Sequence, residues 1–448
     1  MRGFTRTILF TVLAAALPRA IHAQDSEAAA PRWHAWLLGA QLNFIGQRLE
    51  PLHSPYTGPA SLLPTGDTEM SQAFGIYFGA RLPSGFQAYL DVEMIRGNGV
   101  GHASGLAGVT NGDVVRQGSV DLGKNPYVAR AFLRYTLGLG GAELDTLARA
   151  QDQVPAVTQS RRLEISAGEF ALSDLFDLNR YANSTRLQFT NWGLFQNTAW
   201  DYAADTRGYS RGIAVAWITP RWALRAASFQ MPTAANGNTL DGDLAHARGD
   251  QLELTVQPGG SGTVIRLLGY LNHARMGSYA DAIRIAQQTA QTPDIVADDA
   301  PGRTKYGFGL NVEQPLADSG ETGLFARFGW SDGRNESFAF TEVDQHLSVG
   351  LQISGARWRR SRDVLAIALA DHGLSDLHRE YLAMGGRGFL LGDGRLNYGH
   401  ERILEAYYRV QLGRWVQASP DLQEIWNPGY NRDRGPATVL GFRLNVRY

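Results

Sequence analysis

Segments in which apolar and polar side chains alternate recur along this chain, and they constrain its fold more than any other feature. In the first segment, one face carries Trp36, Leu38, Ala40, Leu42 and Phe44, and the other carries Gln41 and Asn43. Residues 86–94 and 305–313 repeat the pattern. Because successive side chains of a strand point to opposite faces, each segment predicts a strand with one apolar and one wet face.

Alternation alone also fits a soluble antiparallel sheet, so the length of the segments matters. Many are about ten residues long, enough for a tilted strand to cross an apolar band of roughly 25 Å, whereas soluble strands average about five or six. The wet faces also carry charges at strand centres, which a water-filled lumen accommodates at little cost: Arg130, Arg134, Glu164, Glu253, Arg266, Arg327, Glu405, Arg409 and Arg443.

The connections between segments are alternately short and long, as in bacterial outer-membrane barrels. Both chain ends should lie in the periplasm, which requires an even number of strands. Leaving out the doubtful segment 187–201 gives an even number of strands and restores the alternation of short and long connections. The segment then belongs to the third external loop. We therefore predict an all-β fold, a sixteen-stranded antiparallel transmembrane β-barrel with short periplasmic turns and long extracellular loops. The connection 138–161 is long where a short turn is due.

The first residues have the features of a secretory signal. Arg2 and Arg6 precede the apolar stretch 8–17, and Ala23 ends a small-residue cleavage site. We expect a signal peptide at 1–23, a periplasmic segment at 24–34 and the barrel at 35–448. An uncleaved anchor is the alternative, but the stretch is shorter than the roughly 20 residues that a bilayer requires.

Composition excludes several classes of protein. The chain has no Cys, which excludes disulfides, thiolate zinc sites and a lipoprotein anchor. Its net charge of -1 argues against nucleic acid, which needs a basic face. The expected location is the Gram-negative outer membrane, in contact with its lipids and lipopolysaccharide.

Aromatic residues fall where the predicted topology places the membrane interfaces, which amphipathic rings favour. Trp36, Trp217, Trp222 and Trp415 lie near the periplasmic rim, and Trp330 and Trp426 near the outer rim. The last segment alternates up to Tyr448, an aromatic terminus common in such barrels, and we expect the barrel assembly machinery to recognise it. A homo-oligomer is left open.

Three short patterns could suggest a hydrolase, a phosphate site or a metal site, but each lies in a predicted structural context that does not suit that function. Residues 208–212 match a hydrolase nucleophile elbow, which must join a strand to a helix, but they lead into an alternating strand. Residues 259–262 lack the Lys and the helix of a phosphate-binding loop. His372 and His378 share a predicted loop, where solvated polarity is the default over a metal site. We expect no catalytic residues, metal or cofactor, and a short loop helix at 279–288.

An ordered set of further motifs covers most of the chain after the signal. It comprises Gly168-Glu169-Phe170, Ser173-Asp174-Leu175-Phe176-Asp177, Tyr181-Ala182-Asn183, Arg186-Leu187-Gln188-Phe189, Asn191-Trp192, Asp201-Tyr202-Ala203-Ala204-Asp205, Arg207-Gly208-Tyr209, Gly392-Asp393-Gly394, Leu396, Tyr398-Gly399, Glu401, Glu405, Tyr407-Tyr408, Asn427-Pro428-Gly429-Tyr430-Asn431 and Asp433-Arg434-Gly435-Pro436. Together these resemble the carbohydrate-selective porin family of Gram-negative outer membranes. The resemblance implies a sixteen-stranded barrel and passive uptake of monosaccharides such as glucose through a charged and polar constriction.

The chain departs from that family pattern at two places expected near the constriction. Glu169 stands where the family usually has Lys. Ser184-Thr185 stands where an acidic residue usually precedes Arg186.

A sugar offers hydroxyls that donate and accept, apolar ring faces and no charge, so a sugar constriction needs fixed donors, acceptors and aromatic rings. The predicted inward faces supply a balanced set: Asp91, Glu93, Glu253, Glu313 and Glu405 beside Arg130, Arg134, Arg266, Arg327 and Arg409. A phosphate channel would instead want a basic excess. We therefore expect small neutral sugars as the solutes.

We expect the segment 174–205 to press against these inward charges and form the constriction. Arg186 and Asn191 would donate to sugar hydroxyls, Asp174 and Asp177 would accept, and Trp192 would stack on a ring face. The predicted constriction residues are Asp174, Asp177, Asn183, Arg186, Asn191, Trp192, Asp201, Asp205, Arg130, Glu405 and Arg409. For each of them, bracing the loop against the wall is the alternative role.

Other functions remain open on the sequence alone. One is a pore for a different small solute, such as a carboxylate. Another is a barrel enzyme, which would need a Ser/His pair on the lipid-facing wall near a rim. The third is a structural barrel with a plugged lumen.

Overall fold

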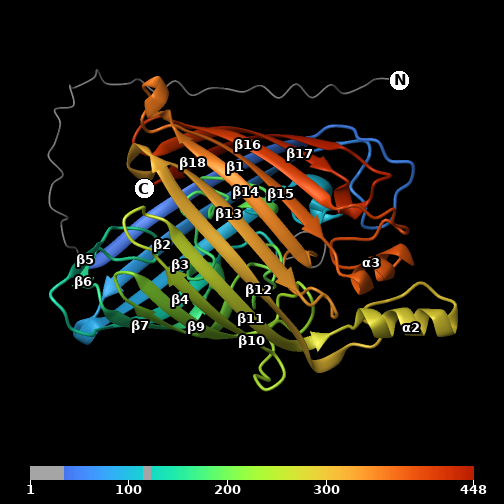
Figure 1. Ribbon diagram of the computed structural model, residues 1–448, viewed down its shortest axis with the longest axis horizontal. Coiled ribbons are helices and arrows are strands. Elements are labelled where there is room, and N and C mark those ends of the chain that lie inside the picture. The colour runs from blue at the N-terminus through green and yellow to red at the C-terminus, as the bar shows by residue number, and fades with distance from the viewer. Residues whose placement is uncertain (1–34, 115–122) are drawn as a thin grey trace. The chain divides into compact units, whose positions relative to one another are not determined.

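The computed structural model describes residues 35–114 and 123–448, and in this part sixteen antiparallel strands close into a barrel (Figure 1). The predicted signal peptide 1–23 and segment 24–34 lie outside the described residues. The barrel strands are β1 (Trp36–Leu49), β2 (Asp67–Arg81), β3 (Phe86–Gly97), β4 (Tyr127–Gly138), β7 (Arg162–Phe170), β8 (Ser210–Ile218), β9 (Trp222–Gln230), β10 (Arg248–Val256), β11 (Val264–Met276), β12 (Ala300–Ala317), β13 (Thr322–Ser331), β14 (Gln345–Ser354), β15 (Val364–Gly373), β16 (Glu401–Gln411), β17 (Val416–Trp426) and β18 (Ala437–Arg447).

The remaining elements lie in the connections. A separate hairpin consists of β5 (Leu144–Leu147) and β6 (Ala156–Gln159). The α-helices are α1 (Trp192–Phe195), α2 (Tyr279–Thr289) and α3 (Asp376–Ala383), and single 3-10 turns are η1 (Pro83–Gly85), η2 (Val100–Ala103), η3 (Leu172–Asp174), η4 (Asp318–Gly320), η5 (Gly355–Trp358) and η6 (Pro428–Tyr430). Within the described residues, no helix is both long enough and apolar enough to cross a bilayer.

The barrel closes because its first strand pairs on both sides. β1 pairs with β2 along one edge and with β18 along the other, in a register from Gln41 opposite Arg447 to Leu49 opposite Val439. The backbone groups of the wall are therefore paired around the ring, as a spanning sheet requires where no water can bind them. The predicted strand number is confirmed.

The wall has two chemically different faces. On β10, Gln251 and Glu253 are buried inside the barrel, whereas Leu252 and Leu254 between and beyond them are 53% and 36% exposed on the outside. Aromatic rings cluster near the short turns: Trp217 meets Trp222 at 5.1 Å, and Trp415 meets Tyr448 at 4.9 Å between ring centroids. This apolar outer face with aromatic residues at its rim suits contact with lipid.

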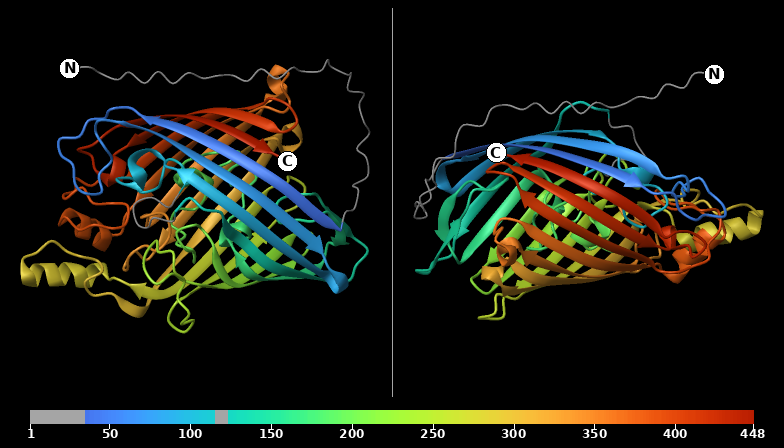
Figure 2. Two further views of the ribbon diagram at one scale, coloured as in Figure 1. Left: turned by 180° about the vertical axis from the view of Figure 1, so that it is seen from behind. Right: turned by 90° about the horizontal axis from the view of Figure 1, so that it is seen from above.

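The two ends of the barrel differ in their connections. We call the end with the C-terminus the short-turn end and the opposite end, where α2 and α3 lie, the long-loop end (Figure 2). The connection 139–161 is at the short-turn end, and its unexpected length is explained by the hairpin β5–β6. The doubtful segment 187–201 forms no strand, as predicted; it contains the short helix α1, which was not predicted. The helix predicted at 279–288 is α2.

Whether the outer face of the wall contacts lipid can be tested by placing a charge on it. Leu369 lies at the middle of β15 and is 49% exposed on the outer wall. Leu369→Arg should lower the free energy of unfolding in lipid vesicles by about 2–4 kcal/mol, because a charge at that depth loses its hydration. The matched variant Ser261→Arg, in an exposed turn at the short-turn end, should leave it unchanged in the same denaturant titration. Equal effects of the two variants would contradict a lipid-facing outer wall.

Candidate pore constriction

The loop between β7 and β8, residues 171–209, folds into the lumen; we call it L3. It carries an apolar cluster that a solvated surface loop would not retain. Five of its apolar side chains are each at most 2% exposed: Phe176, Tyr181, Phe189, Leu194 and Trp200. Phe189 packs edge-on against Tyr407 of β16 at 5.1 Å and also contacts Phe325 of β13. Burial of these rings away from lumenal water holds L3 inside the barrel.

A buried ion pair fixes the first half of L3. Nε of Arg327 on β13 lies 3.0 Å from Oδ2 of Asp177, and the Arg327 side chain is fully buried. Asn311 of β12 donates to Oδ1 of Asp177 at 2.6 Å, and Oδ2 accepts the N–H of Asn197 at 2.8 Å. The N–H of Asp177 in turn donates to Glu253 of β10 at 2.7 Å. The Asp177 carboxylate is thus occupied by the wall and by L3 itself.

A second anchor lies at the start of α1. Glu405 of β16 accepts the N–H groups of Thr190 and Asn191 at 2.6 and 3.0 Å. The Asn191 amide donates to Gln423 of β17 at 3.0 Å, and its oxygen caps α1 by accepting the N–H of Gly193. A carboxylate beside the free N–H groups of a helix start is favourable on electrostatic grounds.

The end of L3 is held in the same manner. Asp201 accepts the N–H of Phe338 at 3.0 Å and lies 3.4 Å from Nζ of Lys305 on β12. Burial raises the pKa of Asp201, and Lys305 opposes that rise. Arg409 of β16 donates to the carbonyl of Leu187 at 3.0 Å. The structure therefore places the following predicted residues in the contacts that brace L3: Asp177, Asn191, Asp201, Glu405 and Arg409.

L3 also spans the lumen to the short-turn end. The Tyr181 hydroxyl donates to the carbonyl of Gly320 in η4 at 2.9 Å. Arg180 pairs with Glu321 at 2.7 Å. A loop from one end of the barrel is thus tied to a turn at the other.

The loop between β3 and β4 also enters the lumen, although no sequence pattern predicts this. We call this loop L2; the structure describes it at residues 98–114 and 123–126. The N–H of Ala107 donates to Glu401 of β16 at 3.1 Å, and Asn43 of β1 donates to Asp113 at 2.7 Å. L2 thereby brings the Asp113 carboxylate beside L3.

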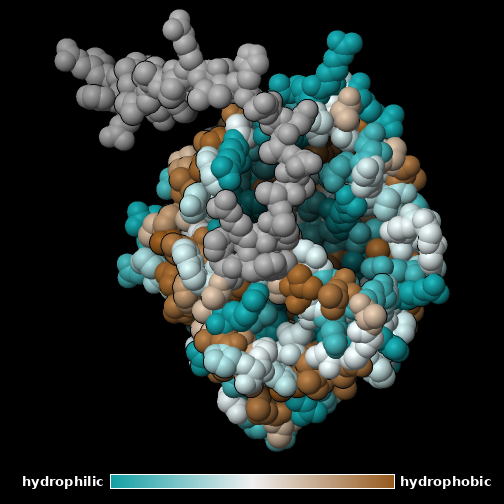
Figure 3. Space-filling model, turned by 90° about the vertical axis from the view of Figure 1, so that its left-hand side faces the viewer, coloured by the Kyte–Doolittle hydropathy of each residue, from teal (hydrophilic) through white to brown (hydrophobic). Residues whose placement is uncertain are grey.

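The loops leave a cavity of about 620 Å³ along the inner faces of β3, β4 and β7. Figure 3 looks into the short-turn end, where hydrophilic residues line a hollow. The cavity brings together the predicted residues Arg130, Asp174, Asn183, Arg186 and Trp192. Its volume is in the range of small-molecule sites.

Arg186 lies between two carboxylates at the cavity surface. Its Nη1 is 3.0 Å from Oε1 of Glu93 on β3, and its Nε is 2.7 Å from Oδ1 of Asp113 in L2. The Tyr209 hydroxyl donates to the other oxygen of Glu93 at 2.7 Å. Three segments of the chain thus fix one guanidinium with acceptors on both sides.

Arg130 forms a second cluster on the same cavity. It binds Asp174 of L3 through two hydrogen bonds of 2.7 and 2.8 Å, which is bidentate geometry. It also lies 3.4 Å from Asp91 and 3.2 Å from Asp152, which belongs to the connection 139–161. Burial raises the pKa of Asp152 to about 7; Arg130 opposes the shift, and the Asp91 and Asp174 carboxylates add to it.

Asp205 lies just behind this surface. Its carboxylate accepts the N–H groups of Arg207 and Tyr209 at 2.9 and 3.2 Å, and burial raises its pKa to about 6. It shapes the turn that presents Tyr209. The Trp192 ring stacks on Phe340 at 4.8 Å while contributing to the cavity wall.

The two departures from the family pattern have different positions. Ser184 and Thr185 line the cavity, as expected. The expectation for Glu169 is wrong: strand alternation places it on the outer face of β7, where it pairs with Arg211 of β8 at 2.9 Å. Its neighbour Phe170 takes the inward position.

The predicted constriction residues do not include Asp113, Asp152 and Tyr209, and Glu93 was predicted only as one of the inward charges of the wall. Glu93 carried a signal, because its inward position follows from alternation on β3. Tyr209 belongs to a family motif. Asp113 and Asp152 have no local signal, since each reaches the cavity only through the path of a long connection.

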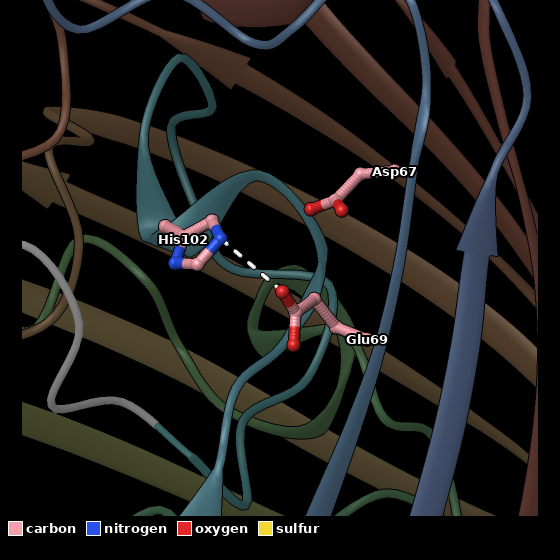
Figure 4. A group of neighbouring side chains, drawn as sticks. All are labelled: Asp67, Glu69 and His102. Carbon is pink, nitrogen blue, oxygen red and sulfur yellow. Dashed lines mark ion pairs between the residues drawn. The ribbon is translucent and has the colours of Figure 1, made fainter. Parts of the chain in front are cut away.

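A separate acidic group lies near the long-loop end. His102 of η2 is 3.3 Å from Glu69 of β2, with Asp67 alongside (Figure 4). Asp67 accepts the N–H of Gly101 at 3.1 Å. These contacts join the start of L2 to β2.

A closed barrel with an apolar outer wall, inward-folded loops and a charged constriction is the architecture of an outer-membrane porin. The sequence profile of the carbohydrate-selective porin (OprB) family matches residues 80–448, and the chain belongs to this family. It is therefore a carbohydrate-selective porin of the outer membrane.

A solved porin structure shows the same fold. Pseudomonas putida OprB at high pH superimposes with a TM-score of 0.67 at 16% identity, covering 92% of this chain and 94% of that one. OmpT of Vibrio cholerae gives 0.47 at 9% identity, with coverage of 93% and 99%. Salmonella typhi OmpF with daunomycin gives 0.47 at 8%, with coverage of 92% and 97%. A search of curated protein sequences returned no match.

The buried anchor of L3 yields a test. Asp177→Ala leaves Arg327 buried without its carboxylate, which weakens loop docking by about 3–5 kcal/mol. Single-channel conductance should therefore rise, with larger current fluctuations, in planar bilayers. Asp376→Ala is the control, because that side chain is 90% exposed in a surface pair with Arg379. An unchanged conductance in a folded Asp177→Ala variant would contradict the anchoring role.

Asp152 predicts a pH-dependent ion selectivity. With a pKa of about 7 it is mostly protonated at low pH and ionised at high pH. Between about pH 6 and about pH 8 the cavity therefore gains negative charge, and the cation-to-anion permeability ratio should rise. Reversal potentials in a KCl gradient measure this ratio. Asp152→Asn should remove most of the change; a variant that retains all of it would assign the titration to other groups.

Proposed function

We propose that uncharged monosaccharides such as glucose cross the constriction through the cavity between L2, L3 and the wall of β3, β4 and β7. The observation that supports this most is Arg186 held between Glu93 and Asp113. A sugar hydroxyl beside this group accepts from the guanidinium and donates to a carboxylate. The donors and acceptors are fixed before the sugar arrives, so little ordering is needed.

Arg130 with Asp174 repeats the arrangement on the same cavity. Because each arginine is paired with carboxylates, the cavity offers hydrogen bonds without a strong net charge. A neutral sugar can then form and exchange hydrogen bonds with these groups, whereas an ion gains little electrostatic attraction. Binding through a few exposed polar atoms stays weak enough for release, which conduction requires.

The remaining predicted residues divide into two roles in this proposal. Asn183 and Trp192 contribute to the cavity wall, where they contact the sugar. Asp177, Asn191, Asp201, Asp205, Glu405 and Arg409 act indirectly, by keeping L3 in place. Transport is passive, and no chemical step on the sugar is part of the proposal.

Export and assembly complete the proposal. The segment 1–23 directs export and is cleaved. The assembly machinery recognises β18 with its terminal Tyr448, which is 61% exposed and packs on Trp415. Lipopolysaccharide and outer-membrane lipids surround the wall, and association with further copies of the chain is compatible with it.

Arg186→Gln tests the sugar site. It removes a charge-assisted hydrogen bond of about 1.5 kcal/mol, so glucose permeation in swelling liposomes should fall by about tenfold. The Glu93 and Asp113 carboxylates, no longer neutralised by Arg186, should at the same time make the pore more cation-selective.

Arg180→Gln is the control, because Arg180 belongs to the same loop but pairs with the exposed Glu321. If Arg186→Gln passes glucose at the unmodified rate, the proposed site is wrong. If the unmodified protein passes charged acids as fast as glucose, the preference for neutral sugars fails.

A further inference from the structure

The connection between β4 and β7 is unlike the neighbouring short turns such as 219–221. Its strands β5 and β6 pair from Leu144 opposite Gln159 to Leu147 opposite Ala156. The residues between the last pair, 148–155, form the part that we call the hairpin tip.

The hairpin tip is seated in a prepared slot on the inner wall. Val154 is fully buried, and its N–H donates to the Tyr89 hydroxyl of β3 at 3.2 Å. Glycine at position 79 of β2 leaves room for this contact, because a Cβ there would lie 2.8 Å from the Tyr89 ring and 3.1 Å from Val154 Cγ2. Arg81 of β2 donates to the carbonyl of Pro155.

The polar residues of the tip face the constriction. The Gln151 amide donates to Asp91 of β3 at 2.6 Å. The carbonyl of Asp152 accepts from Arg134 of β4 at 2.9 Å, and its carboxylate lies 3.2 Å from Arg130. Side chains of the wall thus hold both the backbone and the side chains of the tip.

The tip and L3 meet on the same guanidinium. Arg130 binds Asp174 of L3 and Asp152 of the tip, although these come from opposite ends of the barrel. Gln151, Asp152 and Gln153 line the same cavity as Arg186. The cavity is therefore bounded by L3 on one side and by the hairpin tip on the other.

We propose that the hairpin tip is a size-selecting element on the periplasmic side of the sugar pathway, with Gln151 and Asp152 as its specificity-determining residues. The proposal rests on the proposed passage of sugars through the cavity. A seated tip limits the length of solute that fits between itself and L3. A monosaccharide fits while in contact with Arg186 and Arg130, and a disaccharide meets the tip before it can leave.

The test removes the tip without disturbing the barrel. Because Leu147 faces Ala156, an Asn-Gly turn in place of residues 148–155 closes the hairpin with favourable two-residue geometry. A second variant, Val154→Asp, keeps the hairpin at its full length but places a charge in the buried position of Val154, which disfavours binding of the tip to the inner wall. Swelling rates of proteoliposomes are measured with glucose and with sucrose, beside single-channel conductance.

Both variants should raise the sucrose-to-glucose ratio of rates severalfold and raise conductance. A control with a shortened exposed turn at 258–262 should keep the unmodified ratio. An unmodified ratio in variants that retain the barrel circular-dichroism spectrum would overturn the size-selecting role. Failure of the unmodified protein to pass glucose would instead count against the proposed function itself.

Discussion

The seam between β1 and β18 is the contact on which the rest of this structure depends. In lipid an unpaired strand edge has no water to bind its backbone, so an open sheet of this size is excluded. Once the seam closes, the alternation of side chains separates two environments: one face of each strand contacts lipid, and the other faces the water-filled lumen. The inward charges, the loops that bind them and the cavity all presuppose that enclosed water.

Inward-facing charges of the wall serve two purposes, and the path of L3 decides which. Where L3 lies over the wall, Arg327, Glu405 and Lys305 are buried and bind the loop. Along β3, β4 and β7, where L3 leaves a cavity against the wall, Arg130 and Glu93 border that cavity and pair with Asp174 and Arg186 at the edge of L3. Residues of the same type on equivalent strand faces therefore hold L3 in place on one side of the lumen and, in the proposed function, contact the solute on the other.

This division explains how far the sequence predicts the molecule. Strand number, closure and the two faces follow from a period of two and from connection lengths, which are local properties. The roles of Asp177 and Arg186 were not separable, because both are polar residues of one loop and only its seat against the wall distinguishes them. Asp113 and Asp152 depend on chain paths that no local pattern encodes. Glu169 was misplaced because a shift of one residue along a strand exchanges lumen for lipid.

The apolar cluster of L3 gives this membrane protein a second interior. Phe176, Phe189 and Trp200 are withdrawn from water inside the lumen, as in the core of a soluble domain, while the barrel wall is maintained by backbone pairing and by the surrounding hydrocarbon. The stability of the L3 cluster depends on water, and that of the barrel wall depends on the surrounding lipid. An aqueous denaturant such as urea weakens the first directly and reaches the second only through its rims. We therefore expect such a molecule to unfold in steps, with an intermediate in which L3 has left its seat while the barrel wall is still folded.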